Sequence, residues 1–253
     1  MGNILKFLSS FILYLFSAYA DGELRMGTAS GYAPYVSLNA EGTYEGFDID
    51  VSYALARKLD KQLVLKDFGS MPSLLLALKQ GKVDAIIWGL SIIKERQKEI
   101  NLIHYQGERE PYISFLFWNE LPEGLHSIED LEKLPDKKPI DIEAATSQES
   151  ILRNYPNLPL KFVDKISDAV LDVKYQKSIA VAIDPALIPT MISKEPRLKP
   201  IHLVVPSDLQ VMGLGIGVAK ENALLTAQVE KAISELKKDG TIRQLELKWK
   251  LVK

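Results

Sequence analysis

One stretch, residues 81–96 with the sequence GKVDAIIWGLSIIKER, limits the possible folds of this chain more than any other. Residues 83–88 form a near-continuous apolar run, which is typical of a parallel strand buried on both faces. Gly89 then permits a tight backbone path, and Ser91 is suited to cap a helix whose first turns carry the charged residues 94–99. A strand that passes through a glycine into a capped helix predicts an open α/β sheet. Such sheets bind ligands at the carboxyl ends of their strands.

Arg96 is the first candidate for ligand binding. It lies one to two turns into the predicted helix, from where its side chain can reach back over the end of the strand. A guanidinium group beside free helix N–H groups suits a carboxylate, because it can donate two parallel hydrogen bonds. The alternative is that Glu95 and Arg96 lie on a solvated helix face, as such pairs commonly do.

The stretch resembles the signature of the family 3 extracellular solute-binding proteins, the amino-acid receptors of ABC importers. That signature reads roughly G-K-x-D-A-I-I-x-G-[LM]-[ST]-I-T-x-[ED]-R. The chain departs from it with Ile93 in place of threonine and with Trp88 in place of a small residue. In the family the arginine binds the α-carboxylate of the ligand. The resemblance therefore implies this role for Arg96 and brings Gly89 and Ser91 to the same site.

The first twenty residues have the pattern of a secretory signal peptide. Lys6 supplies a positive charge, residues 7–17 are apolar, and residues 18–20 form an A-x-A cleavage site. The stretch is short for a membrane span, although an uncleaved N-terminal anchor is the alternative. We expect the mature chain to begin near Asp21 and to be exported to the periplasm.

Composition narrows the possible chemistry. The net charge of −2 gives no basic surface for nucleic acid. The absence of cysteine excludes a cysteine nucleophile, a disulfide framework and a lipidated cysteine. The three histidines, His104, His126 and His202, lack the spacing of zinc ligands. We therefore expect no metal, no cofactor and no nucleic-acid partner.

Two further candidates lie on either side of the second predicted strand, residues 62–68. Residues 28–35 match the family pattern T-x-x-x-Y-x-P-[FY], whose first aromatic stacks on the ligand side chain, so the resemblance makes Tyr32 a candidate. The alternative is a turn aromatic packed on its own lobe. Met71 aligns with the family's second aromatic, and a methionine that fills a gap in the core is the alternative. Ala29 stands where receptors for basic amino acids often have an acidic residue, which weakens the case for a cationic ligand.

Trp88 leaves several possibilities open. Its side chain can stack on a guanidinium group or an aromatic ring of the ligand. It can instead fill the pocket and exclude long side chains, or point into the core of the lobe. The motif G-F-D-I-D at residues 46–50 also matches the family. We interpret its acidic residues as structural, because they complement the dipole at the start of a helix.

The second half of the chain supplies three candidates. Residues 146–149 form a capping box that resembles the family's G-[ST]-[ST]-x-E, whose backbone and hydroxyls contact the ligand carboxylate. Thr146 and Ser147 are therefore candidates, although capping alone accounts for Thr146. Asp184 ends a predicted strand, where the family has an acidic residue that binds the α-amino group of the ligand. A turn aspartate before Pro185 is the alternative.

The resemblance covers essentially the whole mature chain and implies an α/β fold of the periplasmic-binding-protein type II. This fold has two lobes, each a mostly parallel sheet flanked by helices, and a two-segment hinge. The β-α-β-α-β order through Gly89 agrees with a parallel sheet. The expected division is a signal peptide at 1–20, a first lobe at 21–108 and 207–253, a second lobe at 112–203, and hinges near 107–112 and 201–208.

The expected function is capture of a free amino acid by lobe closure and its delivery to the permease of an ABC transporter. Arginine or another polar amino acid is the expected ligand, because residues 106–109 and the region of Asp184 resemble the chlamydial arginine-binding proteins. The resemblance implies a monomer and no catalysis. One alternative is a periplasmic dehydratase-like enzyme acting on cyclic carboxylates, with Asp184 or Glu149 as general acid or base. Another is a degenerate receptor, because Ala29, Met71 and Trp88 depart from the family site.

Overall fold

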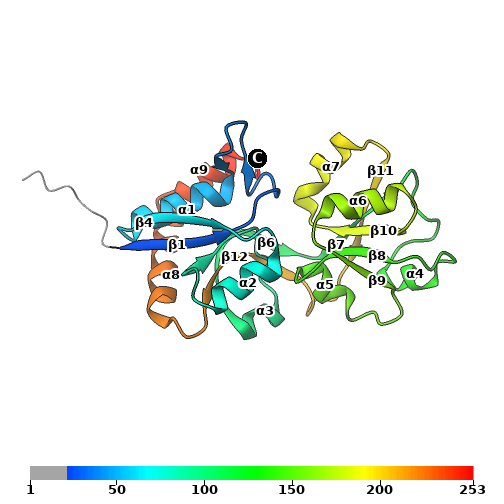
Figure 1. Ribbon diagram of the computed structural model, residues 1–253. Coiled ribbons are helices and arrows are strands. Elements are labelled where there is room, and N and C mark those ends of the chain that lie inside the picture. Colours follow the sequence, from blue (N-terminus) through cyan, green and yellow to red (C-terminus); the bar gives the residue numbers. More distant parts are fainter. Residues whose placement is uncertain (1–21, 253) are drawn as a thin grey trace, which may run out of the picture.

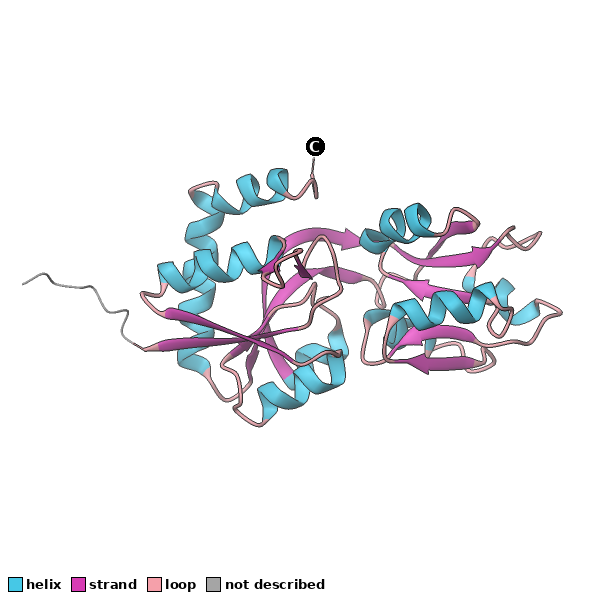
Figure 2. Cartoon of the chain, turned by 45° about the horizontal axis from the view of Figure 1, so that its top comes forward, coloured by secondary structure: helices cyan, strands magenta, loops and turns pink. Residues whose placement is uncertain are grey.

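The computed structural model describes residues 22–252, which form an α/β protein of two lobes (Figures 1 and 2). The predicted signal peptide, residues 1–20, lies outside the described residues. Each helix within residues 22–252 is too short or too polar to span a lipid bilayer.

The first lobe is built on a five-stranded sheet with the strand order β4-β1-β5-β12-β6. Four of its strands run in one direction and β12 runs against them. The strands are β1 (Glu23–Thr28), β4 (Gln62–Asp67), β5 (Ala85–Ile86), β6 (Ile100–Glu110) and β12 (Val211–Ala219). The predicted mostly parallel sheet is thus confirmed in this lobe, and its central strands are buried as the apolar run indicates.

Helices cover both faces of this sheet (Figure 1). They are α1 (Phe47–Lys58), α2 (Met71–Lys79), α3 (Lys94–Glu99), α8 (Ala223–Lys238) and α9 (Thr241–Lys248), and a small hairpin of β2 (Ser37–Leu38) and β3 (Tyr44–Glu45) precedes α1. Helix α8 shows why such segments are helical. Asn222 caps its first turn by accepting a hydrogen bond from the N–H of Leu225, and Val229, Ile233 and Leu236 follow on one buried face.

The second lobe contains a five-stranded sheet with the order β11-β7-β10-β8-β9. Again four strands share one direction, and β7 opposes them. The elements are β7 (Tyr112–Trp118), α4 (Ile128–Lys133), β8 (Ile140–Glu143), α5 (Ser147–Leu152), β9 (Leu160–Val163), α6 (Ile166–Lys174), β10 (Ala180–Ile183), the 3₁₀ turn η1 (Pro185–Leu187), α7 (Ile188–Lys194) and β11 (Leu198–Val204).

The chain crosses between the two sheets twice. The first crossing lies at Pro111, between β6 and β7, and the second at residues 205–210, between β11 and β12. The polar composition of residues 105–111 predicts an irregular segment, but β6 continues to Glu110 because β12 pairs beside it. A polar segment can form a strand when a distant partner satisfies its backbone, and this partner is not evident from the local sequence.

The helix after the signature stretch begins at Lys94, so the prediction that Ser91 caps it is wrong. Ser91 instead forms a bridge with Leu214, and the backbone of Ile92 exchanges hydrogen bonds of 2.8 and 3.0 Å with Gly213 and Met212. Strand β12 therefore holds this segment in an extended form. Arg96 becomes the third residue of a six-residue helix.

Candidate functional site

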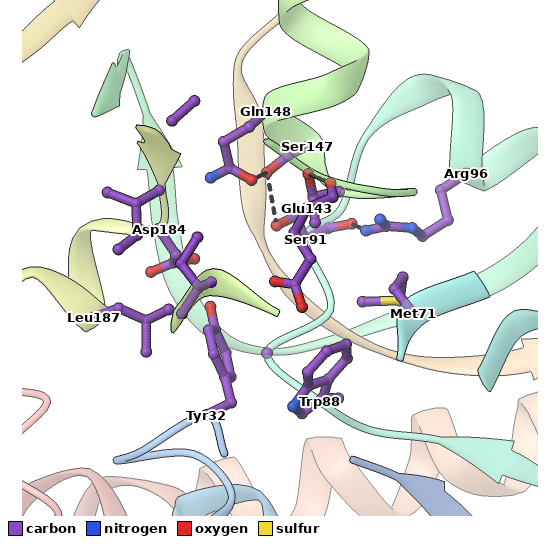
Figure 3. A pocket seen from close by; sticks show the side chains of 15 residues that line it. Tyr32, Met71, Trp88, Ser91, Arg96, Glu143, Ser147, Gln148, Asp184 and Leu187 are labelled. Carbon is purple, nitrogen blue, oxygen red and sulfur yellow. Dashed lines mark hydrogen bonds between the residues drawn. The ribbon is translucent and has the colours of Figure 1, made fainter. Parts of the chain in front are cut away.

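A cavity between the two lobes is lined by 15 residues, most of which are labelled in Figure 3. The nine predicted site residues are all among them: Tyr32, Met71, Trp88, Gly89, Ser91, Arg96, Thr146, Ser147 and Asp184. The remaining lining residues are Glu143, Gln148, Ile166, Ala182, Ile183 and Leu187. The structure thus brings the predicted residues together, while their contact with a ligand stays a prediction.

Arg96 is a buried cation that forms no ion pair with an acidic side chain of residues 22–252. Its side chain is 6% exposed and donates hydrogen bonds of 2.5 Å to the carbonyl of Ser91 and 2.7 Å to the carbonyl of Ala145. Burial lowers the pKa of the guanidinium to about 10, so the group is still charged at neutral pH. No carboxylate of residues 22–252 forms an ion pair with it, and the negative charge of Glu99 opposes the lowering only in part. A dehydrated guanidinium with only carbonyl partners favours binding of an anion.

Two serines and a threonine lie beside Arg96. The hydroxyls of Ser91 and Ser147, which come from different lobes, are 3.2 Å apart. Thr146 caps α5, because its hydroxyl accepts a hydrogen bond from the N–H of Glu149. Ala145 has a φ of +59°, the left-handed region in which the family's glycine is favoured. The capping interpretation of Thr146 is confirmed, and its contact with a ligand remains a prediction.

Asp184 faces Arg96 from the other side of the cavity (Figure 3). It follows β10, and its carboxylate caps η1 by accepting a hydrogen bond of 2.8 Å from the N–H of Ala186. Burial raises the pKa of the Asp184 carboxyl, while hydrogen bonding with the Tyr32 hydroxyl opposes this shift. The pKa of Tyr32 is raised well above its usual value by burial and by the Asp184 charge. Tyr32 therefore links the first lobe to the carboxylate of the second.

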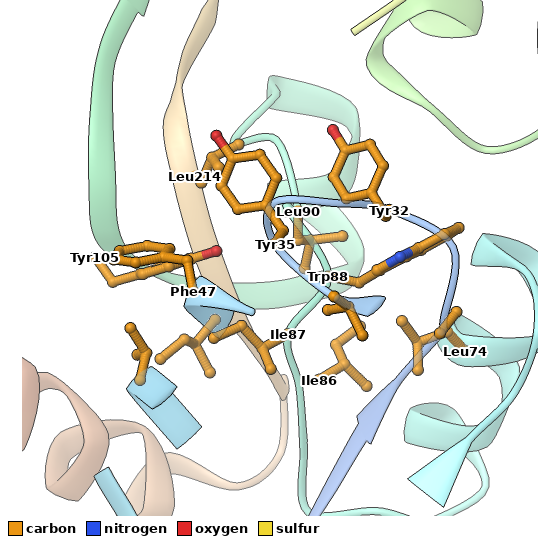
Figure 4. Packing of buried hydrophobic residues seen from close by; sticks show 14 of the residues in the cluster. Tyr32, Tyr35, Phe47, Leu74, Ile86, Ile87, Trp88, Leu90, Tyr105 and Leu214 are labelled. Carbon is orange, nitrogen blue, oxygen red and sulfur yellow. The ribbon is translucent and has the colours of Figure 1, made fainter. Parts of the chain in front are cut away.

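Aromatic rings form the floor of the cavity. Tyr32 contacts Trp88 edge to face at 5.7 Å between ring centroids, and stacks on Tyr35 at 5.3 Å (Figure 4). Trp88 is 7% exposed and belongs both to the core cluster of the first lobe and to the cavity wall. Met71, the first residue of α2, lies in the same wall. The proposed core roles of Tyr32, Trp88 and Met71 are thus compatible with a place at the site.

Glu143 is the main site residue that sequence reasoning missed. It is the last residue of β8, where Ile140 and Ile142 point into the core of the second lobe. The alternation of side chains along a strand sends Glu143 to the opposite face. Its position at a carboxyl strand end, just before the capping box, was a signal that could have identified it. Gln148, the second residue of α5, was missed as well.

The G-F-D-I-D motif supports the cavity wall through hydrogen bonds inside the first lobe. The buried carboxylate of Asp48 accepts hydrogen bonds of 2.6 Å each from the N–H of Gly89 and the hydroxyl of Tyr105. Burial raises the pKa of Asp48 to about 6, although both hydrogen bonds act against the rise. Gly89 has a φ of +50°, and a Cβ there would lie 2.2 Å from Cε1 of Tyr32. The motif is structural, as expected, but its first aspartate acts by positioning the backbone of the cavity wall.

We expect the substitution Asp48→Ala to lower the free energy of unfolding by about 3 kcal/mol, because it removes two buried hydrogen bonds to a charged acceptor. That corresponds to about 6–12 °C in unfolding temperature for a chain of this size. Tyr105→Phe is the matched control, since it removes one of the two hydrogen bonds, and it should cost about half as much. Thermal unfolding followed by circular dichroism measures both. An unfolding temperature unchanged in Asp48→Ala would contradict this role.

No three His, Asp or Glu side chains within residues 22–252 are grouped so that they could hold a metal ion. The second aspartate of the motif, Asp50, accepts hydrogen bonds from Lys248 and from the indole N–H of Trp249, at 2.7 and 2.6 Å. It therefore ties α1 to the C-terminal K-W sequence. The acidic residues of the motif thus have structural partners on the first lobe.

The comparisons with known proteins agree on one family. The model of the bacterial extracellular solute-binding proteins, family 3, matches residues 24–252. The probable ABC transporter arginine-binding protein ArtJ of Chlamydia trachomatis serovar D is 31% identical over 226 residues, which span 89% of this chain and 85% of that protein. An ancestral arginine-binding protein bound to arginine superposes with a TM-score of 0.77 at 26% identity, and covers 91% of this chain and 99% of its own.

A second solved structure bears on the choice between receptor and enzyme. The ancestral amino-acid-binding protein AncCDT-1, a precursor of cyclohexadienyl dehydratase, superposes with a TM-score of 0.73 at 26% identity over 90% of this chain and 95% of its own. The three relatives are named as binding proteins or as the precursor of an enzyme, and the predicted type II fold is confirmed by these neighbours. The chain belongs to family 3 of the bacterial extracellular solute-binding proteins.

Proposed function

We propose that this protein captures a free α-amino acid between its lobes and delivers it to the permease of an ABC importer. One observation carries the proposal. A buried guanidinium of the first lobe, Arg96, and a half-buried carboxylate of the second lobe, Asp184, line the same cavity. The α-carboxylate and α-ammonium groups of an amino acid are complementary to this pair.

The carboxylate would take the donors of Arg96 that now bind the carbonyls of Ser91 and Ala145. The hydroxyls of Ser91 and Ser147 are close enough to each other to donate to the same group. The ammonium would bind Asp184. A charged group that is removed from water is costly unless an opposite charge pairs with it. The two charges of the ligand would supply such partners and so compensate for the desolvation of Arg96 and Asp184.

Because the two charges come from different lobes, the amino acid binds the closed arrangement better than an open one. Binding therefore shifts the population toward the closed form, and the permease would recognise that form. Contacts between the lobes already include the Arg96–Ala145 hydrogen bond and a hydrogen bond of 2.9 Å from Ser150 to Glu95. The proposed moving bodies are residues 21–108 with 207–253, and residues 112–203. The proposed hinges lie near 107–112 and 201–208.

We further propose export through cleavage of residues 1–20, action as a monomer in the periplasm, and binding without catalysis. The apolar segment ending in Ala-Tyr-Ala supports export. The similarity to a probable ABC transporter arginine-binding protein supports a permease partner and makes arginine the first ligand to test. None of the three histidines lines the cavity within residues 22–252, so a general acid or base would have to be a carboxyl such as Asp184 or Glu143.

A thermal-shift screen against the twenty amino acids tests the proposal. The protein is first unfolded, washed and refolded, so that carried ligand is removed. A ligand at about 100 times its Kd adds about 2.7 kcal/mol of stability, which is about 5–10 °C for a chain of this size. We expect such a shift with one chemical class of amino acid. A flat response to all twenty would contradict amino-acid capture.

A further inference from the structure

Glu143 brings a second carboxylate into the cavity, from the same lobe as Asp184. Figure 3 shows its side chain projecting from β8 into the cavity, on the side of Trp88. Its backbone lies in the ladder with β9, and its carbonyl accepts a hydrogen bond of 2.7 Å from the hydroxyl of Thr146. Among the described residues, no hydrogen bond or ion pair of the Glu143 carboxylate is found. A half-buried carboxylate without a partner is costly in the protein unless a ligand satisfies it.

A zwitterion without a charged side chain would leave one charge of the cavity without a partner. The ionisable side chains that line the cavity, besides the phenol of Tyr32, are Arg96, Glu143 and Asp184, which carry one positive charge and, when both carboxyls are ionised, two negative charges. An amino-acid zwitterion supplies one charge of each sign and leaves one carboxylate unpaired. A third ligand charge, a positive one on the side chain, would complete the pairing.

We propose that Glu143 is the counter-ion of a cationic side chain, and that it selects amino acids ending in a guanidinium or ammonium group over uncharged ones of the same shape. This inference rests on the proposed binding of the ligand backbone by Arg96 and Asp184. Trp88 lies on the same side of the cavity, and the face of an indole ring suits such a cation. Glu143 would thus supply from the second lobe an acidic group that Ala29 does not supply from the first.

The pH dependence of binding follows from the surroundings of Glu143. Burial, helped by the negative charge of Asp164, raises the pKa of Glu143 to about 7. The other ionisable groups facing the cavity are Arg96, Asp184 and Tyr32. Only the ionised carboxylate pairs with a cation, so arginine should bind about tenfold more weakly at pH 6 than at pH 8. Citrulline has the shape of arginine but an uncharged side chain, so it cannot form this ion pair. The pH dependence of its Kd therefore measures the contribution of the other ionisable groups of the cavity.

Titration calorimetry with arginine and citrulline at pH 8 tests the assignment. We expect the unmodified protein to prefer arginine by at least about 30-fold, as for a buried charge pair. In Glu143→Gln the two Kd values should come within about threefold of each other. Asp164→Asn is the matched control, because it removes a nearby but exposed negative charge outside the cavity. It should keep the preference. Because both ligands are measured on the same sample, the ratio of their Kd values does not depend on the fraction of folded protein.

Two results would overturn the assignment and leave amino-acid capture intact. One is citrulline binding the unmodified protein as tightly as arginine. The other is Glu143→Gln keeping the full preference for arginine. Binding of a neutral amino acid such as glutamine, with none of arginine, would also exclude the counter-ion role alone. If no amino acid binds, the proposed function fails together with this inference.

Discussion

Replacing Arg96 by alanine is expected to abolish amino-acid binding at ordinary ligand concentrations. The change removes the buried guanidinium that would receive the α-carboxylate and leaves that anion without a partner. Loss of one member of a buried, hydrogen-bonded charge pair costs about 2–5 kcal/mol, which is about 30- to 5,000-fold in Kd. Titration calorimetry with the amino acid that gives the largest thermal shift measures this loss.

Arg96→Lys is the matched control for charge. Lysine keeps the positive charge but lacks the planar pair of donor groups with which the guanidinium binds Ser91 and Ala145 and would bind a carboxylate. Its Kd should lie between those of the unmodified protein and of Arg96→Ala. Unliganded unfolding temperatures show whether each variant is folded. Binding by a folded Arg96→Ala variant with an unchanged Kd would rule out a role of this residue in binding.

The substitution Asp184→Asn should weaken binding without lowering the stability of the unliganded protein. Asparagine can still cap η1 by accepting the hydrogen bond from Ala186, but it removes the charge that would pair with the α-ammonium group. The Kd should rise by at least about 30-fold. The pKa of Asp184 is raised in the folded protein. A carboxyl of this kind destabilises the fold increasingly as the pH rises above its unfolded pKa, so the unliganded variant should unfold at the same or a higher temperature at neutral pH.

The variant Glu110→Gln is the control for charge. It shows whether the loss of affinity in Asp184→Asn reflects a direct contact with the ammonium group or only the removal of a negative charge. Burial and repulsion by Asp184 raise the pKa of Glu110 to about 7, yet Glu110 does not line the cavity that holds Arg96. Its neutralisation should change the Kd by no more than about threefold. Equal losses in Glu110→Gln and Asp184→Asn would indicate a long-range electrostatic effect and would contradict a direct contact with the ammonium group.

The main architecture could be predicted from the sequence because it depends on local patterns, and much of the site could be predicted because these patterns carry motifs that resemble those of the family. The apolar run before Gly89 and the signature ending at Arg96 indicate the parallel sheet and the cavity wall. The capping box at Thr146 identifies the start of α5. The placement of all nine predicted residues around one cavity agrees with these local patterns, because each follows the end of a strand or begins a helix.

What could not be predicted depends on contacts between distant segments. Strand β12 pairs with residues 91–92 and so delays α3 to Lys94. The carboxylate of Asp48 reaches Gly89, which lies 41 residues away in the sequence. Local propensity carries no information on any of these long-range contacts.

Titration of one amino acid in three forms tests the central claim most directly. The forms are the free amino acid, its α-amide, which lacks the carboxylate charge, and its N-acetyl derivative, which lacks the ammonium charge. If Arg96 and Asp184 hold the two ends of the zwitterion, the free form binds, and each blocked form binds at least about 30-fold more weakly. Blocked forms that bind within about threefold of the free amino acid would contradict recognition of the zwitterion by opposite charges on the two lobes.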